Sequence, residues 1–151
     1  MLEPTRESIA AFSVGGLKTR TTNTAEMNPA TAQLGRLWSQ FFSQDVMGKT
    51  PGRTADPRNF GVYAQYESDA SGAFDVTAGV SVTQGATVEV EAGDYLVFKA
   101  EGAVPMSVVA AWQRVWQYFE EHPGTVRRYR TDFEAYSSPT EAAVYIGIER
   151  N

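Results

Sequence analysis

Two stretches of the chain carry apolar residues at the spacing of an amphipathic helix. One runs from residue 28 to about 44 and the other from residue 105 to about 121. Asn28 suits an N-cap, Pro29 suits the first helical position, and His122-Pro123-Gly124 ends the second stretch. Each helix is expected to bury one face. The buried faces consist of Leu34, Leu37, Trp38, Phe41 and Phe42, and of Val108, Val109, Trp112, Val115, Trp116 and Phe119.

Most of the remaining chain shows the pattern of strands that bury one face. Phe74 to Val82 alternates apolar and polar residues throughout. The other predicted strands are residues 60–67, 95–100, 132–136 and 143–148. Polar turn segments at 68–72 and 137–140 join neighbouring strands into hairpins.

The order strand, helix, strand, strand occurs twice, and the residues repeat with it. The matches, in chain order, are Phe12 with Phe98; Arg36-Leu37-Trp38 and Phe41 with Arg114-Val115-Trp116 and Phe119; Phe60 and Tyr63 with Phe133 and Tyr136; and Ala78-Gly79-Val80 with Ile146-Gly147-Ile148. We interpret the chain as one α+β domain of duplicated βαββ modules with pseudo-twofold symmetry. Module 1 spans about 1–84 and module 2 about 85–151. We expect an antiparallel sheet, two main helices and a ligand cleft at the module seam.

Composition narrows the chemistry that such a domain can perform. The 151 residues include no cysteine and one histidine, which excludes thiolate chemistry and leaves little material for a Ser-His-Asp triad or a metal site. A net charge of −5 argues against direct nucleic-acid binding, and Arg127, Arg128 and Arg130 are interpreted as a solvated strand edge. The sequence contains neither an apolar run long enough to span a membrane nor a signal-peptide core. We expect a cytoplasmic protein with no cofactor or metal and no membrane partner.

One predicted strand places a carboxylate beside an aromatic ring. Alternation puts Phe133 and Ala135 on the core face, and Glu134 and Tyr136 on the opposite face. Tyr145 on the neighbouring strand is expected to share the face of Glu134. Glu134 is therefore a candidate binding residue with tyrosines around it.

The earlier hairpin is expected to add Tyr63, Gln65, Asp75 and Thr77 to the side of the sheet away from the helices. Aromatic rings around Glu134 would suit a lipophilic cation, because cation–π attraction adds about 0.5–2 kcal/mol per ring to direct charge pairing. Burial would raise the pKa of the empty carboxyl group. In the alternative interpretation this face is solvated and Glu134 is an ordinary surface acid.

Trp112 and Trp116 lie four residues apart on one face of the second helix, where core packing is the usual role. Trp116 matches Trp38 of module 1, which favours a shared packing role for that pair. Trp112 replaces Leu34 and breaks the symmetry. Trp112 is therefore the better candidate for lining a pocket.

Four groups of residues occur in a specific order over nearly the whole chain. They are GLKTRTTN (16–23) with EMNP (26–29) and LW (37–38); YAQYESD (63–69) with GAFD (72–75) and AGV (78–80); AGDYLVF (92–98) with AWQRVW (111–116); and TDFEAY (131–136). Together they resemble the GyrI-like, AraC-type effector-binding domain family.

The resemblance implies duplicated βαββ modules that bind lipophilic or cationic compounds, as in multidrug-sensing transcription regulators. It implies that Glu134 faces the bound cation. The pocket aromatics would include Trp112 or Trp116, Tyr63, Tyr136 and Tyr145. The chain has no room for the helix-turn-helix domain of such regulators, so we expect a stand-alone form of the kind found on mobile integron cassettes.

Three functional hypotheses follow. The first is a small-molecule binding domain for lipophilic, cationic compounds, with a drug-sensing or transcription-linked role. The second is an enzyme with Glu134 as general acid or base, assisted by Tyr136 or Tyr145, since relatives are implicated in hydrolysis of cyclopropane-bearing compounds. The third is a protein that interacts with gyrase or with a DNA-binding regulator. The lack of cysteine and the single histidine favour binding over catalysis.

Overall fold

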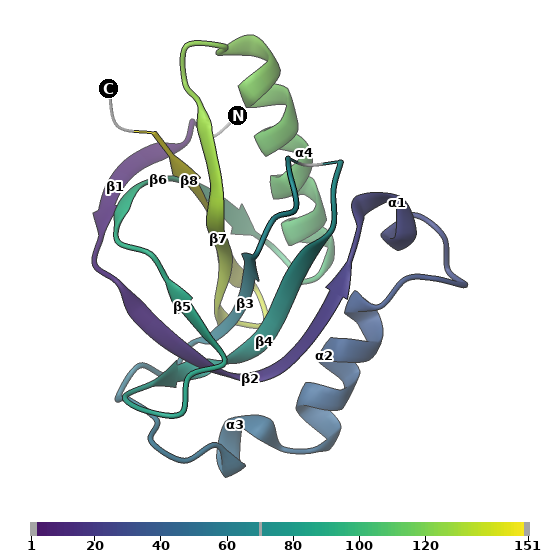
Figure 1. The fold of residues 1–151 in the computed structure, drawn as a ribbon, viewed down its shortest axis with the longest axis vertical. Coiled ribbons are helices and arrows are strands. Elements are labelled where there is room, and N and C mark those ends of the chain that lie inside the picture. The colour runs from purple at the N-terminus through teal and green to yellow at the C-terminus, as the bar shows by residue number, and fades with distance from the viewer. Residues whose placement is uncertain (1–2, 70, 150–151) are drawn as a thin grey trace.

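Residues 3–69 and 71–149, which the computed structural model describes, form one antiparallel sheet of eight strands with four helices (Figure 1). The strands are β1 (Thr5–Ile9), β2 (Phe12–Thr21), β3 (Asn59–Ala64), β4 (Phe74–Val82), β5 (Val88–Val90), β6 (Gly93–Glu101), β7 (Arg127–Ser138) and β8 (Glu141–Ile148). The helices are α1 (Asn23–Glu26), α2 (Leu34–Ser43), α3 (Val46–Lys49) and α4 (Met106–Glu121). The sheet order is β1-β6-β8-β7-β3-β4-β2-β5.

The predicted α+β fold of duplicated βαββ modules is confirmed by this order. β2-α2-β3-β4 forms one half of the sheet and β6-α4-β7-β8 forms the other, with β3 and β7 paired at the centre. Gly61 pairs with Glu134 in that register. Gly61 and Glu134 are also equivalent in the repeat, since each lies two residues before a matched tyrosine, Tyr63 or Tyr136. The pseudo-twofold axis therefore passes between Gly61 and Glu134.

The two halves also exchange their outermost strands. β1 precedes β2 in the chain but pairs with β6, and β5 precedes β6 but pairs with β2. Each of these short strands covers the outer edge of the other half. The halves are therefore joined at both edges of the sheet as well as at its centre.

α2 and α4 lie on the same face of the sheet (Figure 1), each over its own half. One face of the sheet can be followed across its centre through directly paired residues. Val144 pairs with Glu134, Glu134 with Gly61, and Gly61 with Ala78, so these four residues lie on the same face. Val108, Ala111 and Val115 of α4 pack on Leu96, Phe98, Val144 and Ile146, and Leu37 and Phe41 of α2 pack on Phe74, Val76, Ala78 and Val80.

The opposite face of the sheet is buried as well, because the sheet curls over a third apolar cluster. That cluster consists of Val14, Phe60, Val62, Val90, Tyr95, Phe133 and Ala135. β4 is consequently buried on both faces along most of its length, where alternation predicted one buried face. The side of the sheet without helices is a second core.

The first helix begins later than predicted. α2 starts at Leu34, and residues 23–26 form the separate short helix α1. The carboxylate of Glu26 accepts hydrogen bonds from the backbone N–H groups of Gln33 at 2.9 Å and Leu34 at 3.1 Å. Glu26 therefore caps α2 from outside, and the N-cap role predicted for Asn28 was wrong. α4 agrees with the second predicted helix to within one residue.

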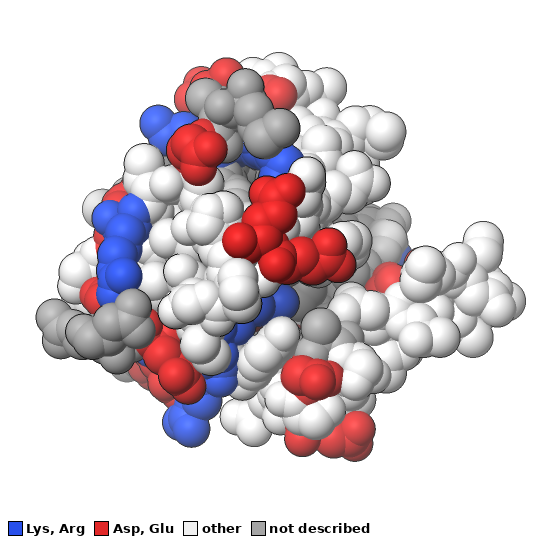
Figure 2. All heavy atoms as spheres, turned by 90° about the horizontal axis from the view of Figure 1, so that it is seen from above, with Lys and Arg blue, Asp and Glu red and all other residues white. Residues whose placement is uncertain are grey.

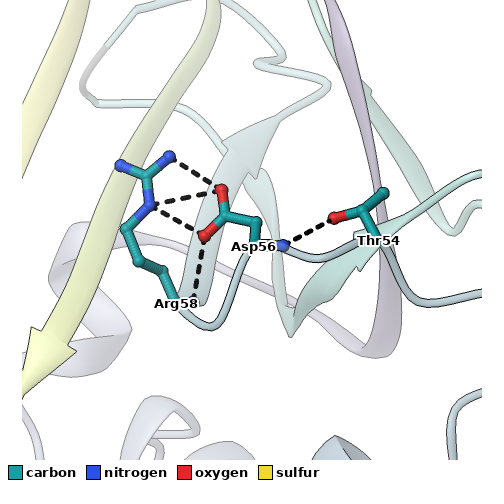
Figure 3. A network of polar contacts seen from close by, with 3 residues as sticks. All are labelled: Thr54, Asp56 and Arg58. Atoms are coloured by element: carbon teal, nitrogen blue, oxygen red, sulfur yellow. Dashed lines mark hydrogen bonds and ion pairs between the residues drawn. The ribbon is translucent and has the colours of Figure 1, made fainter.

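A polar network fixes the loop that leads into β3 (Figure 3). The carboxylate of Asp56 accepts hydrogen bonds from the backbone N–H of Arg58 at 3.0 Å and from its Nη2 at 2.9 Å, while the N–H of Asp56 donates to Thr54 Oγ1 at 3.2 Å. The hydrogen bond from Arg58 lowers the pKa of Asp56 below its ordinary value. This network holds the chain immediately before the central strand.

On the face viewed in Figure 2, basic and acidic side chains lie close to one another among uncharged areas. That face offers no broad basic surface for a phosphate backbone. Among the helices that the structure describes, none is both long enough and apolar enough to cross a membrane.

Candidate functional site

The carboxylate of Glu134 lies on the pseudo-twofold axis, under α2 and α4, with 4% of the residue exposed. Three neutral groups donate hydrogen bonds to it: Tyr63 OH to Oε2 at 2.8 Å, Trp112 Nε1 to Oε2 at 2.7 Å, and Tyr136 OH to Oε1 at 2.6 Å. Within the described part of the chain, no lysine, arginine or histidine forms an ion pair with this carboxylate. Among the described residues, the polar partners of the buried Glu134 carboxyl group are thus all neutral.

The duplication explains the geometry around this carboxylate. Tyr63 and Tyr136 are equivalent residues of the two modules, and each donates to one carboxylate oxygen. At the position equivalent to Glu134 the chain has Gly61, where a Cβ atom would lie 2.9 Å from Glu134 Oε1 and 3.1 Å from Trp38 Cζ2. The absent side chain therefore leaves space for one carboxylate on the axis.

Burial sets the protonation chemistry of the site. Desolvation raises the pKa of Glu134, and the hydrogen bonds from Tyr136, Trp112 and Tyr63 partly oppose this increase. Burial and the nearby carboxylate both raise the pKa of Tyr63 and of Tyr136 above the ordinary value for tyrosine. Both hydroxyl groups consequently stay protonated and act as donors. The Glu134 carboxyl group is therefore protonated more readily than that of an ordinary glutamate.

Aromatic rings surround the carboxylate. The ring of Trp112 lies 5.2 Å from that of Tyr63, with an interplanar angle of 61°, and Trp116 lies 6.4 Å from Trp112. On the other side, the ring of Trp38 lies 5.3 Å from that of Tyr136. Rings from both helices and both central strands therefore cover Glu134.

Several apolar residues near this cover are exposed, although the sequence predicted them to be buried. Trp116 is 48% exposed and Val109 is 49% exposed on α4, and Phe42 is 61% exposed on α2. Trp116 contacts Trp112, and Phe42 stacks on Trp38 at 6.1 Å. Exposed apolar surface on both helices is thus continuous with the rings that cover Glu134.

The structure brings together Glu134, Tyr63, Tyr136 and Trp112, with Trp116 next to Trp112. These residues lie on the face covered by the helices, so the predicted helix-free location was wrong. Gln65, Asp75 and Thr77 do not join them. Asp75 and Thr77 lie on the opposite face of β4 from Val76, which belongs to the cluster of Tyr63 under α2, and Gln65 follows the end of β3.

Tyr145 also lies on the other face. It pairs with Phe133 and stacks on its ring at 4.3 Å with an interplanar angle of 9°, whereas Val144 pairs with Glu134. The prediction that Tyr145 shares the face of Glu134 was wrong, because it assumed that all apolar residues of the two strands lie on one side.

Two contributors to the site were not singled out from the sequence. Trp38 was assigned to packing, and its match with Trp116 was the only signal available. Gly61 carried no signal by itself, because its importance depends on the register of β3 against β7.

A second buried carboxylate lies two residues before Glu134 on the same strand. Asp132 has 0% exposure and accepts hydrogen bonds from Arg127 Nη2 at 2.8 Å, Tyr66 OH at 2.5 Å and the backbone N–H of Gly147 at 2.8 Å. The side chain of Arg127 is only 7% exposed, so the predicted solvated edge was wrong for this residue. Asp132 therefore forms an ion pair with Arg127, whereas no ion pair of Glu134 is found among the described residues.

Two cavities of the structure lie away from Glu134. One of about 470 Å³ lies between α2, β2 and residues 30–33. The other, of about 930 Å³, lies on the helix-free face near the ends of the β3–β7 pair, with Arg20, Gln65, Asp75 and Tyr129 among its lining residues. Glu134 lines neither, because Trp112, Trp38 and the two tyrosines occupy the space around it.

The described part of the chain offers few side chains that could bind a metal ion together. Residues 3–69 and 71–149 contain no cluster of three or more His, Asp or Glu side chains that could hold a metal ion. The chemistry at Glu134 is therefore that of one buried carboxylate, neutral donors and aromatic rings.

Comparisons with known proteins agree with this architecture. A family model described as Cass2, integron-associated effector binding protein, matches residues 7–148. The integron cassette protein VCH_CASS2, from the mobile metagenome of Vibrio cholerae, shares 37% identity, with a TM-score of 0.82 over 97% of this chain and 95% of that one.

Two solved structures at 16% identity share the fold. One is SAV2435 bound to tetraphenylphosphonium, with a TM-score of 0.73 over 98% of this chain and 94% of that one. The other is a putative bacterial transcription regulation protein from Staphylococcus aureus MU50, with a TM-score of 0.80 over 99% and 100%. A comparison with curated protein sequences gave no match.

Proposed function

Since the chain belongs to the Cass2 family of integron-associated effector binding proteins, we propose that it binds lipophilic monovalent cations at Glu134, between α2 and α4. The observation that carries the proposal is the buried carboxylate with three neutral donors and no ion pair among the described residues. A buried charge without a partner is costly, and a bound cation would remove that cost.

The surrounding rings support a large apolar cation as the ligand. Four rings in two contacting pairs border the carboxylate: Trp112 with Tyr63, and Trp38 with Tyr136. Each cation–π contact adds about 0.5–2 kcal/mol, and burial of the ligand's apolar surface adds further free energy. SAV2435, which shares the fold at 16% identity, was solved bound to tetraphenylphosphonium, a cation of this kind.

Binding requires the rings to move. Trp112 donates its indole N–H to Glu134, and a quaternary cation must approach the carboxylate where that ring now lies. The exposed side chains of Phe42 and Trp116 give the ligand an apolar route to Trp38 and Trp112. Because ring contacts are tolerant of shape, we extend the proposal to binding of several lipophilic cations and to a sensing role.

The test compares two probes of similar size and opposite charge. We expect tetraphenylphosphonium to bind saturably at one site, measured by isothermal titration calorimetry and by quenching of tryptophan fluorescence, whereas tetraphenylborate does not bind at that site. Equal affinity for both ions would show that apolar contact alone drives binding. Absence of tetraphenylphosphonium binding would contradict the proposal.

The affinity should depend on pH through Glu134. Tetraphenylphosphonium keeps its charge at every pH, so its affinity should fall as acidification protonates Glu134, whose pKa burial raises above the ordinary value for glutamate. Trp112→Phe removes one of the donors that oppose this increase, and it should move the midpoint of the affinity profile to higher pH. Calorimetric titrations across the pH range measure both midpoints.

Trp116→Phe is the matched control, since the half-exposed Trp116 makes no hydrogen bond to Glu134. Its midpoint should equal that of the wild type. An unchanged midpoint in Trp112→Phe would show that the indole N–H does not control the carboxylate in solution.

A further inference from the structure

The side-chain oxygen Oδ1 of Asn59 is buried and has no hydrogen-bond partner among the described residues. An unsatisfied buried amide oxygen is uncommon in folded proteins, because it loses its bonds to water and gains none in return. Asn59 is the first residue of β3 and follows Arg58, whose network fixes the loop in Figure 3. The backbone at Asn59 is thus held in place while its side chain keeps an unused acceptor.

The register puts this acceptor beside the cation site. Asn59 pairs with Tyr136 on one side and with Val80 on the other, and it lies two residues before Gly61 on the same face of β3. Val80 belongs to the cluster under α2, and the ring of Tyr136 contacts Trp38 of α2. The Asn59 side chain therefore lies on the face that carries Glu134.

The duplication makes Asn59 the counterpart of Asp132, since each lies two residues before the axis position on its own strand. Asp132 is saturated by Arg127, Tyr66 and the N–H of Gly147. Asn59 has none of these partners. Of the two equivalent positions that flank Glu134, only the one in β3 retains a free acceptor.

Asn59 and Glu134 are diagonal neighbours on adjacent antiparallel strands, since Gly61 pairs with Glu134 and Asn59 with Tyr136. Diagonal residues in such a pair are about 7–8 Å apart. We propose that Asn59 Oδ1 accepts a hydrogen bond from an N–H group of the ligand, so that the site favours lipophilic cations with an N–H donor several ångströms from the charge centre. Aromatic cations with amino or iminium N–H groups fit this description, and fully N-alkylated cations do not.

This inference rests on the proposed cation site and adds a preference within it. The test uses two xanthylium dyes of equal charge: rhodamine 123, which carries N–H groups, and tetramethylrhodamine methyl ester, in which methyl groups replace them. Asn59→Leu keeps the side-chain size and removes the acceptor. It should weaken rhodamine 123 binding about 2- to 13-fold, the loss expected for one hydrogen bond, and leave binding of the tetramethyl dye almost unchanged.

Asn59→Asp is the matched variant, because it keeps an acceptor at this position and should retain the selectivity for rhodamine 123. Fluorescence anisotropy measures both dyes, and thermal unfolding checks that each variant is folded. Equal loss of both dyes in Asn59→Leu, or no loss of either, would overturn the role of Asn59.

Tetraphenylphosphonium distinguishes a failure of the cation site from a failure of the proposed Asn59 hydrogen bond. It has no N–H, so Asn59→Leu should leave its affinity unchanged while Glu134→Gln reduces it. If the wild type binds tetraphenylphosphonium but Asn59→Leu changes the affinities of the two dyes by the same factor, the cation site stands and the inference fails. If the wild type binds neither tetraphenylphosphonium nor the dyes, the proposed function itself fails.

Discussion

Glu134→Gln should weaken binding of tetraphenylphosphonium roughly 30- to 800-fold, which corresponds to the loss of about 2–4 kcal/mol for removing one charge of a buried pair. The carboxylate supplies the negative charge, while the rings of Trp112 and Trp38 would still supply apolar contact. Calorimetry measures the two affinities. Glu120→Gln on the exposed face of α4 removes the same charge and should leave the affinity within about twofold.

The substitution should not unfold the protein. The amide oxygen of glutamine can accept from Tyr63 and Trp112, and its NH₂ group can donate to the hydroxyl oxygen of Tyr136. Burial raises the pKa of Glu134 in the folded state, so its contribution to stability is present below the unfolded-state pKa and is lost as the pH rises through the folded-state pKa.

Glu134→Gln should therefore be at least as stable as the wild type at about pH 8, with a smaller advantage near pH 4. Thermal unfolding at the two pH values measures this difference. A variant that is destabilised at pH 8 would show that the charged carboxylate supports the fold, contrary to our interpretation.

Arg127→Met should destabilise the fold by about 3–5 kcal/mol, because it leaves Asp132 as a buried charge without its cation. Urea unfolding measures the change. Arg130→Met is the matched control: Arg130 is 65% exposed in its ion pair with Glu91, and its loss should cost less than about 1 kcal/mol.

The double variant Arg127→Met/Asp132→Asn tests the cause. Asparagine has no charge and can still accept from the N–H of Gly147, so most of the lost stability should return. If the double variant is as unstable as Arg127→Met, the loss arises from packing of the Arg127 side chain on Phe119 and Tyr129 and not from the ion pair.

Much of the fold could be predicted because the repeat carries long-range information. Matching Phe60 and Tyr63 with Phe133 and Tyr136 identified β3 and β7 as equivalent strands of the two modules, and periodicity located α4 and β4 closely. β1 and β5 were missed, since both are short and depend on partners in the other half. The start of α2 was misplaced because its cap, Glu26, comes from another helix.

Periodicity could establish which residues share a face, but not what covers that face. Alternation correctly separated Glu134 and Tyr136 from Phe133. It could not identify the face under the helices, because the curled sheet buries both. The register of β8 against β7 places Tyr145 on the opposite face from Glu134. This register depends on pairing between the strands, so the periodicity of either strand alone cannot predict it.

The exchanged edge strands constrain how the chain is made. Arg6 of β1 is hydrogen-bonded to Asp94 of β6, 88 residues further along. During synthesis, β1 leaves the ribosome long before β6 has been made, so β1 has no partner strand during that time. Contacts of such high sequence separation predict slow, late closure of the fold, so the nascent chain is most vulnerable to proteases and aggregation before β6 and β8 are released.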